Sequence, residues 1–131
     1  MDRKYDLQRS DNPVFEAIIH GLPVDDIEAL LRSDSDYIHY TFSSQSLMDI
    51  SISEGRLEVV KVLIDNGFPL DGIFGSSHPL SSAMHYDQIE IAEFLINEGS
   101  DPYSGNPSPI DLAKFSENEQ YMSLFGEERG R

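Results

Sequence analysis

The chain has 131 residues, with 24 Asp and Glu against 9 Lys and Arg, which gives a formal net charge of −15, and it contains no cysteine. This length, with 39% hydrophobic residues, predicts one domain with a single core over residues 1–131. The lack of cysteine excludes disulfide bonds, thiolate metal sites and a cysteine nucleophile. No apolar stretch is long enough to span a membrane, and residues 1–10 do not resemble a signal peptide, so we expect a cytoplasmic protein.

The negative charge also limits the expected partners. Nucleic acids and anionic membranes are bound through Lys and Arg, so neither is an expected partner. The sequence has no Lys or Arg between Lys61 and Lys114. The same interval holds eight acidic residues: Asp65, Asp71, Asp87, Glu90, Glu93, Glu98, Asp101 and Asp111. Two interpretations remain open: this acidity maintains solubility, or it recognises a basic partner.

The first predicted unit covers residues 12–33. Its opening, NPVFEAIIHG, has Asn12 at a helix N-cap position and Pro13 at the first helical position. The segment VDDIEALL at residues 24–31 predicts a second amphipathic helix. We therefore expect a pair of short helices here.

The next two units are copies of one another. Residues 46–67 align with residues 78–99 without a gap, at a constant shift of 32 residues. Leu63 then matches Leu95, and Gly67 matches Gly99. Such internal repetition is typical of proteins built from stacked structural units.

Each copy predicts two helices. The second helix of residues 46–67 has apolar residues on one face, at i, i+3, i+6 and i+7: Leu57, Val60, Leu63 and Ile64. Gly67 and Gly99 suit the left-handed position that ends a helix. The small residues Ser51 and Ala83 occupy equivalent positions in the first helices, where they let two helices approach closely.

A fourth unit closes the predicted series at residues 108–125. SPIDLAKFS, at residues 108–116, repeats the opening with a cap residue followed by proline, and a weaker helix is expected near residues 119–125. Polar residues gather at this end, as expected of a terminal unit with an outer face that meets water.

These units resemble the ankyrin repeat, which has about 33 residues, a turn, two helices and a T-P-L-H-x-A opening. HPLSSA at residues 78–83 and SPIDLA at residues 108–113 match that opening best, and IEIAEFLINEGSDP at residues 89–102 is similar to the second helix and following turn. The resemblance implies an all-α ankyrin-repeat solenoid of about four helix-turn-helix units, at residues 12–33, 46–67, 78–99 and 108–125. Unit spacings of 32 and 30 residues predict shortened turns.

The chain departs from the family pattern in two ways. The histidine of the opening, which usually ties neighbouring units, is replaced in all four units, by Phe15, Asp49, Ser81 and Asp111. We expect looser packing in the second unit, which also lacks the proline of the opening. The family glycine between the helices is kept as Gly21 and Gly55 but becomes Asp87 in the third unit. We expect Asp87 to adopt the same left-handed conformation at some energetic cost.

Ankyrin repeats overwhelmingly serve as protein-binding modules, and this is what the resemblance implies here. The family's contact positions correspond to the turn tips and to the ends of the first helices. These positions are Phe42 and Phe74 at the tips, and His20, Glu54, His85, Tyr86, Phe115 and Ser116 at the helix ends. Asp87 and Glu54 are expected to meet Lys or Arg of a partner. The alternative for Phe42, Phe74 and Phe115 is that each folds back into the core.

No catalytic, metal-binding or cofactor-binding residues are expected. His78, His85 and Asp87 could be drawn as a metal triad, but the sequence lacks the H-E-x-x-H spacing that places two ligands on one helix face. It also lacks a G-x-S-x-G nucleophile motif, and GIFGSS at residues 72–77 lacks the lysine of a phosphate-binding loop.

The leading hypothesis is therefore a nonenzymatic, acidic inhibitor or immunity protein that binds a basic protein, such as a toxin, and occludes its active site. By itself the chain is expected to be a monomer. The alternative is an intracellular regulatory adaptor or subunit whose partner is not basic.

Overall fold

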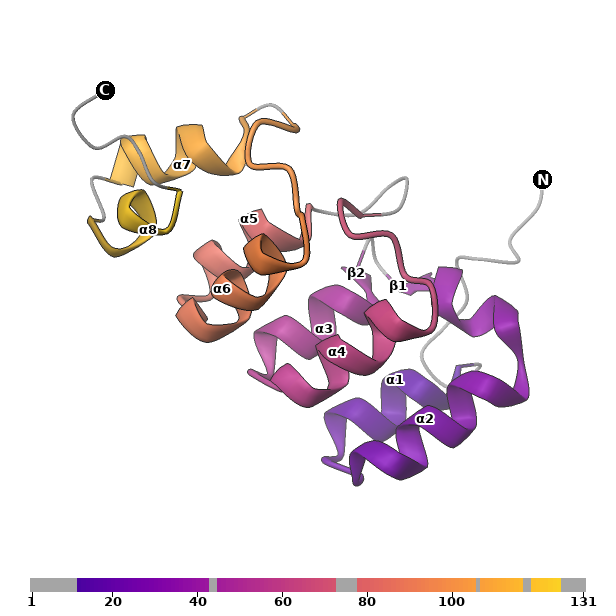
Figure 1. The fold of residues 1–131 in the computed structure, drawn as a ribbon. Coiled ribbons are helices and arrows are strands. Elements are labelled where there is room, and N and C mark those ends of the chain that lie inside the picture. The colour runs from indigo at the N-terminus through magenta and orange to yellow at the C-terminus, as the bar shows by residue number, and fades with distance from the viewer. Residues whose placement is uncertain (1–11, 43–44, 73–77, 106, 117–118, 126–131) are drawn as a thin grey trace.

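The computed structural model describes residues 12–42, 45–72, 78–105, 107–116 and 119–125 (Figure 1). These residues are mostly helical, which confirms the expected all-α class. The α-helices are α1 (Pro13–Ile19), α2 (Val24–Ser33), α3 (Leu47–Ser53), α4 (Leu57–Asp65), α5 (Pro79–His85), α6 (Ile89–Asn97), α7 (Pro109–Ser116) and α8 (Glu119–Leu124). A 3-10 helix, η2 (Ser35–His39), and two short strands, β1 (Thr41–Phe42) and β2 (Gln45–Ser46), lie between α2 and α3. Within the described segments, no helix has the length and apolar character needed to cross a membrane.

The described helices form four consecutive pairs, and the two helices of each pair run roughly antiparallel. The pairs are stacked side by side (Figure 1). Within a pair, α1 contacts α2, α3 contacts α4, α5 contacts α6 and α7 contacts α8. Between pairs, the first helices α1, α3, α5 and α7 contact one another in order, and so do the second helices α2, α4, α6 and α8. The stack therefore has a layer of first helices and a layer of second helices, with the core between them.

The two middle pairs reproduce the 32-residue repeat helix by helix. Helices α3 and α5 both have 7 residues, and α4 and α6 both have 9. Leu63 and Leu95, which are equivalent in the repeat, are both fully buried. Ser51 and Ala83 are also fully buried, in the first helices, which contact each other. The predicted helices are confirmed, and both of the predicted small residues are buried.

The turns inside the pairs depend on left-handed backbone. Gly21, Gly55 and Asp87 follow the first helices and have φ angles of 75°, 70° and 58°. Asp87 is the one non-glycine residue with positive φ that the described segments contain. Its predicted left-handed conformation is confirmed. A side chain at this position costs about 1–2 kcal/mol relative to right-handed backbone.

Asp49 links the second and third pairs. It is 5% exposed and forms a reciprocal capping box with Ser46, in which each side chain accepts a hydrogen bond from the other residue's backbone N–H. Its Oδ1 also accepts a hydrogen bond of 3.0 Å from the Ser82 hydroxyl on α5. Looser packing was expected here because the family histidine is absent. That expectation is wrong at this contact, since a buried carboxylate makes the link instead.

His78 joins two successive turns at the start of α5. Its Nδ1 accepts a hydrogen bond of 3.2 Å from the Leu80 N–H, as the N-cap of the helix. Its Nε2 then carries the proton and lies 3.1 Å from the Asp101 carbonyl oxygen and 3.2 Å from Asp71 Oδ1. Both ring nitrogens therefore have structural partners, in agreement with the predicted cap position.

Candidate functional site

Two hollows lie side by side along the layer of first helices. The α3–α5 hollow has a volume of about 370 Å³ and is lined by Gln45, Asp49, Ser81, Ser82, His85, Tyr86 and Leu112. The α5–α7 hollow has a volume of about 420 Å³ and is lined by Ser81, Met84, His85, Asp87, Leu112, Ser116 and Tyr121. Because three residues line both hollows, we treat them as one surface, the first-helix groove. Each volume is near the lower end of the range for ligand pockets in proteins.

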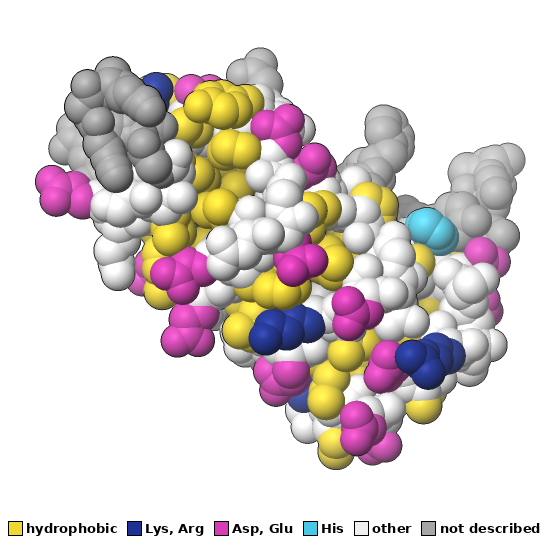
Figure 2. Space-filling view, in the orientation of Figure 1, with side chains coloured by type: hydrophobic (Ala, Val, Ile, Leu, Met, Phe, Trp, Pro, Cys, Tyr) yellow, Lys and Arg dark blue, Asp and Glu magenta, His cyan; other side chains and the backbone are white. Residues whose placement is uncertain are grey.

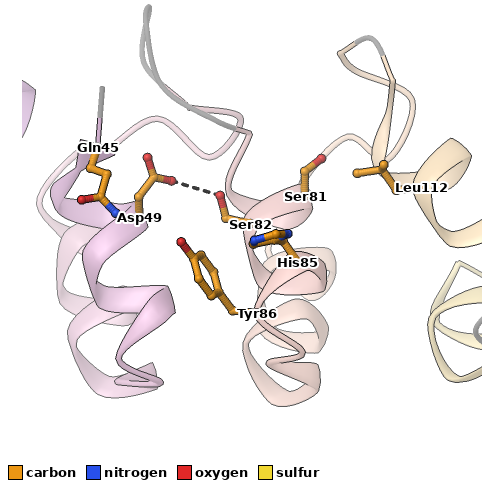
Figure 3. A pocket seen from close by; sticks show the side chains of 7 residues that line it. All are labelled: Gln45, Asp49, Ser81, Ser82, His85, Tyr86 and Leu112. Carbon is orange, nitrogen blue, oxygen red and sulfur yellow. Dashed lines mark hydrogen bonds between the residues drawn. The ribbon is translucent and has the colours of Figure 1, made fainter. Parts of the chain in front are cut away.

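Helix α5 forms the ridge between the two hollows because of its register. Leu80 and Ala83 are fully buried in the core, which leaves other faces of the helix at the groove. Ser81 and His85 are four residues apart and therefore lie on the same face. Figure 3 shows Ser81, Ser82 and His85 along α5, with Asp49 on α3 and Leu112 on α7 to either side.

Two aromatic rings meet at the end of α5. The rings of His85 and Tyr86 are in edge-to-face contact, with centroids 4.8 Å apart and planes at 82°. Tyr86 is 41% exposed, and its hydroxyl points towards the side of the hollow that Gln45 and Asp49 line (Figure 3). An exposed aromatic ring that is held by a neighbour can bury a large area on binding with little loss of rotamer freedom.

The Ser81 hydroxyl is an unusual polar group in this groove. Its Oγ is shielded from solvent and has no hydrogen-bond partner, whereas the adjacent Ser82 hydroxyl donates to Asp49. A buried hydroxyl without a partner costs about 1–3 kcal/mol. The Oγ lies where both hollows meet, so a bound group could supply the missing hydrogen bond.

The charges around the groove are negative. Asp49 and Asp87 line it, and no Lys or Arg is among the residues that line either hollow. Asp87 Oδ1 accepts a hydrogen bond of 3.3 Å from the Tyr121 hydroxyl on α8. Burial and the nearby Asp87 carboxylate raise the pKa of Tyr121 to about 12, so this phenol stays neutral at physiological pH.

The layer of second helices has a different surface. Figure 2 shows this side with acidic side chains spread across it and a band of hydrophobic side chains at the upper left, near α6, α7 and α8. The Lys61 amine of α4 lies 5.6 Å from the centre of the Phe94 ring on α6, within the range of a cation–π interaction. Lys61, the last basic residue before the interval that lacks Lys and Arg, therefore contacts an aromatic ring in the layer of second helices.

Four of the predicted contact residues are brought together by the groove, namely His85, Tyr86, Asp87 and Ser116. Glu54 is exposed at the C-cap of α3 but lines neither hollow. The predicted His20 lines a separate hollow near α1 and α2, where its Nε2 lies 3.1 Å from Glu16 Oε1.

The three predicted phenylalanines have different outcomes. Phe115 is 79% exposed, so the alternative that it folds back into the core is wrong, although it lines neither hollow. Phe42 belongs to strand β1, at the predicted turn, but its side chain lies outside the described part of the structure. Phe74 also lies outside the described residues.

Seven lining residues were not predicted as contacts: Gln45, Asp49, Ser81, Ser82, Met84, Leu112 and Tyr121. Ser81 precedes His85 by four residues and Leu112 precedes Ser116 by four, so helical spacing from the predicted contacts would have found both. Tyr121 comes from α8, and its approach to Asp87 depends on how the last two helix pairs stack. No pattern in the sequence indicates that contact.

The histidines and carboxylates of the described residues are not grouped as a metal site would require. Across the described segments, no group of three or more His, Asp or Glu side chains is arranged to hold a metal ion. His78 makes its contacts in the turns, and His85 lies in the groove. No protein-family model matches the chain, and a search of curated proteins found no significant similarity.

Proposed function

We propose that the four helix pairs are ankyrin-type repeats and that the chain is a nonenzymatic protein-binding module. The 32-residue repeat, the proline at the start of α1, α5 and α7, and the left-handed residue inside each of the first three pairs support this assignment. A surface built from successive first helices is extended, and extended surfaces of stacked repeats bind macromolecules.

The partner is a protein with a basic surface, and binding occludes that surface. One observation carries this proposal. Four residues that the sequence predicted as contacts line the same groove, which is also lined by carboxylates and has no Lys or Arg among its described lining residues. A toxin with a basic active-site cleft is one such partner, and the chain would then act as its immunity protein. Complementary charge would accelerate association and exclude acidic competitors.

An adaptor for a partner that is not basic is the second candidate. It is favoured by the apolar side of the α5–α7 hollow, where Met84, Leu112 and Tyr121 meet, and by the exposed Phe115 ring nearby in sequence. In that case the acidity maintains solubility only.

Capture of the partner from the native host separates the two candidates. Tagged full-length protein is used at low salt and at about 0.5 M salt, where screening acts over much less than the 8 Å of physiological salt. A basic partner should be captured at low salt, associate much more slowly at high salt, and be lost with Asp87→Lys, which reverses a carboxylate of the groove. A partner that is not basic should remain bound in both salts and be lost with Tyr86→Ala.

Glu93→Lys is the matched control for Asp87→Lys. Glu93 is exposed on α6, in the layer of second helices, and its reversal changes the net charge by the same amount. If both reversals weaken capture equally, overall charge rather than the first-helix groove governs binding, and the proposed surface is wrong. Thermal unfolding of each variant establishes that the fold is intact.

A further inference from the structure

We propose that the α3–α5 hollow receives the guanidinium group of an arginine side chain from the partner protein. This inference rests on the proposed function, because it assigns the part of the partner that enters the groove.

The hollow is lined by several polar side chains, one of which has no hydrogen-bond partner. Ser81 Oγ is buried and makes no hydrogen bond. The Gln45 amide and the Tyr86 hydroxyl lie on the opposite wall, beside Asp49 (Figure 3). These oxygens come from β2, from the start of α5 and from its end, so they surround the space from more than one direction. A ligand with several donors in one plane can reach more than one of them.

The charge of the lining selects a cation. Asp49 is 5% exposed, so its negative charge is only partly screened by water and acts on the adjacent hollow. Asp87, on the other side of His85, adds a second carboxylate to the groove. The sequence places no Lys or Arg between residues 61 and 114, so helices α5 and α6 contribute no compensating cation. An anionic or uncharged ligand would lack this complementarity.

Arginine fits these groups better than lysine. Its guanidinium is planar, has five N–H donors and stacks on aromatic rings, whereas the lysine ammonium is a compact and strongly hydrated charge. The Tyr86 ring lines the hollow and can stack with a guanidinium, and the surrounding oxygens can accept its in-plane donors. The volume of about 370 Å³ is large enough for a single side chain but small for a folded segment.

The test is a titration of the full-length protein, labelled with ¹⁵N, with N-acetyl-L-arginine amide. We expect saturable changes in the backbone signals of Ser81, Ser82, His85 and Tyr86, with a dissociation constant on the order of 1 mM for so small a ligand. The citrulline analogue has nearly the same shape but no charge, and it should cause no saturable change. The lysine analogue should bind at least about five-fold more weakly than the arginine compound.

Three variants test the individual contacts. Tyr86→Ala should weaken arginine binding about five-fold, whereas Tyr86→Phe, which keeps the ring, should retain most of the affinity. Ser81→Ala removes the unpaired hydroxyl and should also weaken binding. Tyr103→Ala is the control, because Tyr103 is a 70% exposed aromatic residue that lines neither hollow, and it should bind as the unmodified protein does.

The results separate this inference from the proposed function. Signal changes spread over the acidic surface without saturation, or equal binding of citrulline or lysine, would overturn the inference. Normal capture of the partner by both Tyr86→Ala and Ser81→Ala would also overturn the inference. It would leave a protein-binding function intact. If the arginine compound causes saturable and specific changes but the protein captures no basic partner, arginine binding in the hollow is supported and the proposed function is contradicted.

Discussion

The second and third helix pairs have the same helix lengths and the same buried positions, but they differ at the residues that link the helices. At the start of the first helix, Asp49 in the second pair is equivalent to Ser81 in the third. Asp49 makes capping and interhelical hydrogen bonds, whereas Ser81 Oγ makes none. In the turn between helices, Gly55 is equivalent to Asp87. The repeat therefore preserves the buried core positions, whereas the equivalent positions that link the helices make different contacts in the two pairs.

The difference places stabilising contacts in the second pair, and in the third pair it places groups that belong to the proposed binding groove. A carboxylate that is buried and bonded on several sides fixes α3 against α5, whereas an unpaired hydroxyl at the equivalent position remains available to a ligand. Asp87 reaches Tyr121 on α8, a contact that Gly55 cannot make because it has no side chain. Four measurements test this comparison.

The largest effect should come from the shared core. Leu63→Ala and Leu95→Ala each remove a fully buried side chain and leave a cavity, so each should lower the free energy of unfolding by about 3–4 kcal/mol. Urea unfolding followed by circular dichroism gives both values. Effects that differ by more than about 1.5 kcal/mol would contradict the equivalence of the two pairs.

The contact between Asp87 and Tyr121 predicts sensitivity to alkaline pH. Tyr121 has a pKa of about 12 in the folded protein, against 10.0 for an unperturbed tyrosine, so above pH 10 the unfolded state releases the proton more readily. The stabilisation is fully present below pH 10 and is lost as the pH rises to about 12, by about 2–3 kcal/mol.

Tyr121→Phe removes the titrating group and should abolish this part of the alkaline loss. Asp87→Gly should reduce it only in part, because burial of the phenol is the larger cause of the shift. Unfolding free energies between pH 8 and 12 provide the comparison. An unchanged pH profile in Tyr121→Phe would show that other groups cause the loss.

Asp49 and Ser81 should respond in opposite ways to truncation. Asp49→Ala removes the capping box and leaves the Ser82 hydroxyl without its acceptor, so the expected loss is about 2 kcal/mol. Ser81→Ala removes a hydroxyl that has no partner, so the free energy of unfolding should be unchanged within about 0.5 kcal/mol or should rise. A clear loss of stability in Ser81→Ala would mean that its hydroxyl has a partner in the free protein.

The losses expected in the turns between helices are smaller than the loss in Asp49→Ala. Gly55→Ala should cost about 1–2 kcal/mol, because its φ of 70° is unfavourable for a side chain and the new Cβ would lie 3.0 Å from the Gln88 amide. Asp87→Gly relieves a similar strain but loses the bond to Tyr121, so its net effect should be below about 1 kcal/mol. Equal losses in the two variants would remove the distinction between these turns.

Much of the fold followed from local patterns. The gap-free alignment of residues 46–67 with 78–99 predicted the helices of the two middle pairs, because helix formation in each copy depends on its own apolar spacing. The left-handed conformation of Asp87 also followed from its position between two predicted helices. The expectation of looser packing in the second unit is wrong at one contact, because the sequence pattern shows which residue is missing but not that Asp49 reaches the Ser82 hydroxyl on the next pair.

The candidate site was only partly predictable. His85, Tyr86, Asp87 and Ser116 were identified because the resemblance to ankyrin repeats implies contacts near the ends of the first helices. Their assembly with Gln45, Leu112 and Tyr121 depends on the spacing between pairs, which is set by side-chain packing across four separate helices.

The sequence by itself determined the helical repeat, the exposed ends of α5 and α7, and the scarcity of cations over the third pair. These features depend on residues within one or two turns of each other, or on composition alone. The tertiary structure decided that Ser81 Oγ is shielded without a partner, that Asp49 is bonded across two pairs, and that Tyr121 reaches Asp87. Each of these contacts joins residues about 30 positions apart or depends on exclusion of water by a neighbouring pair, so stacking is needed to create them.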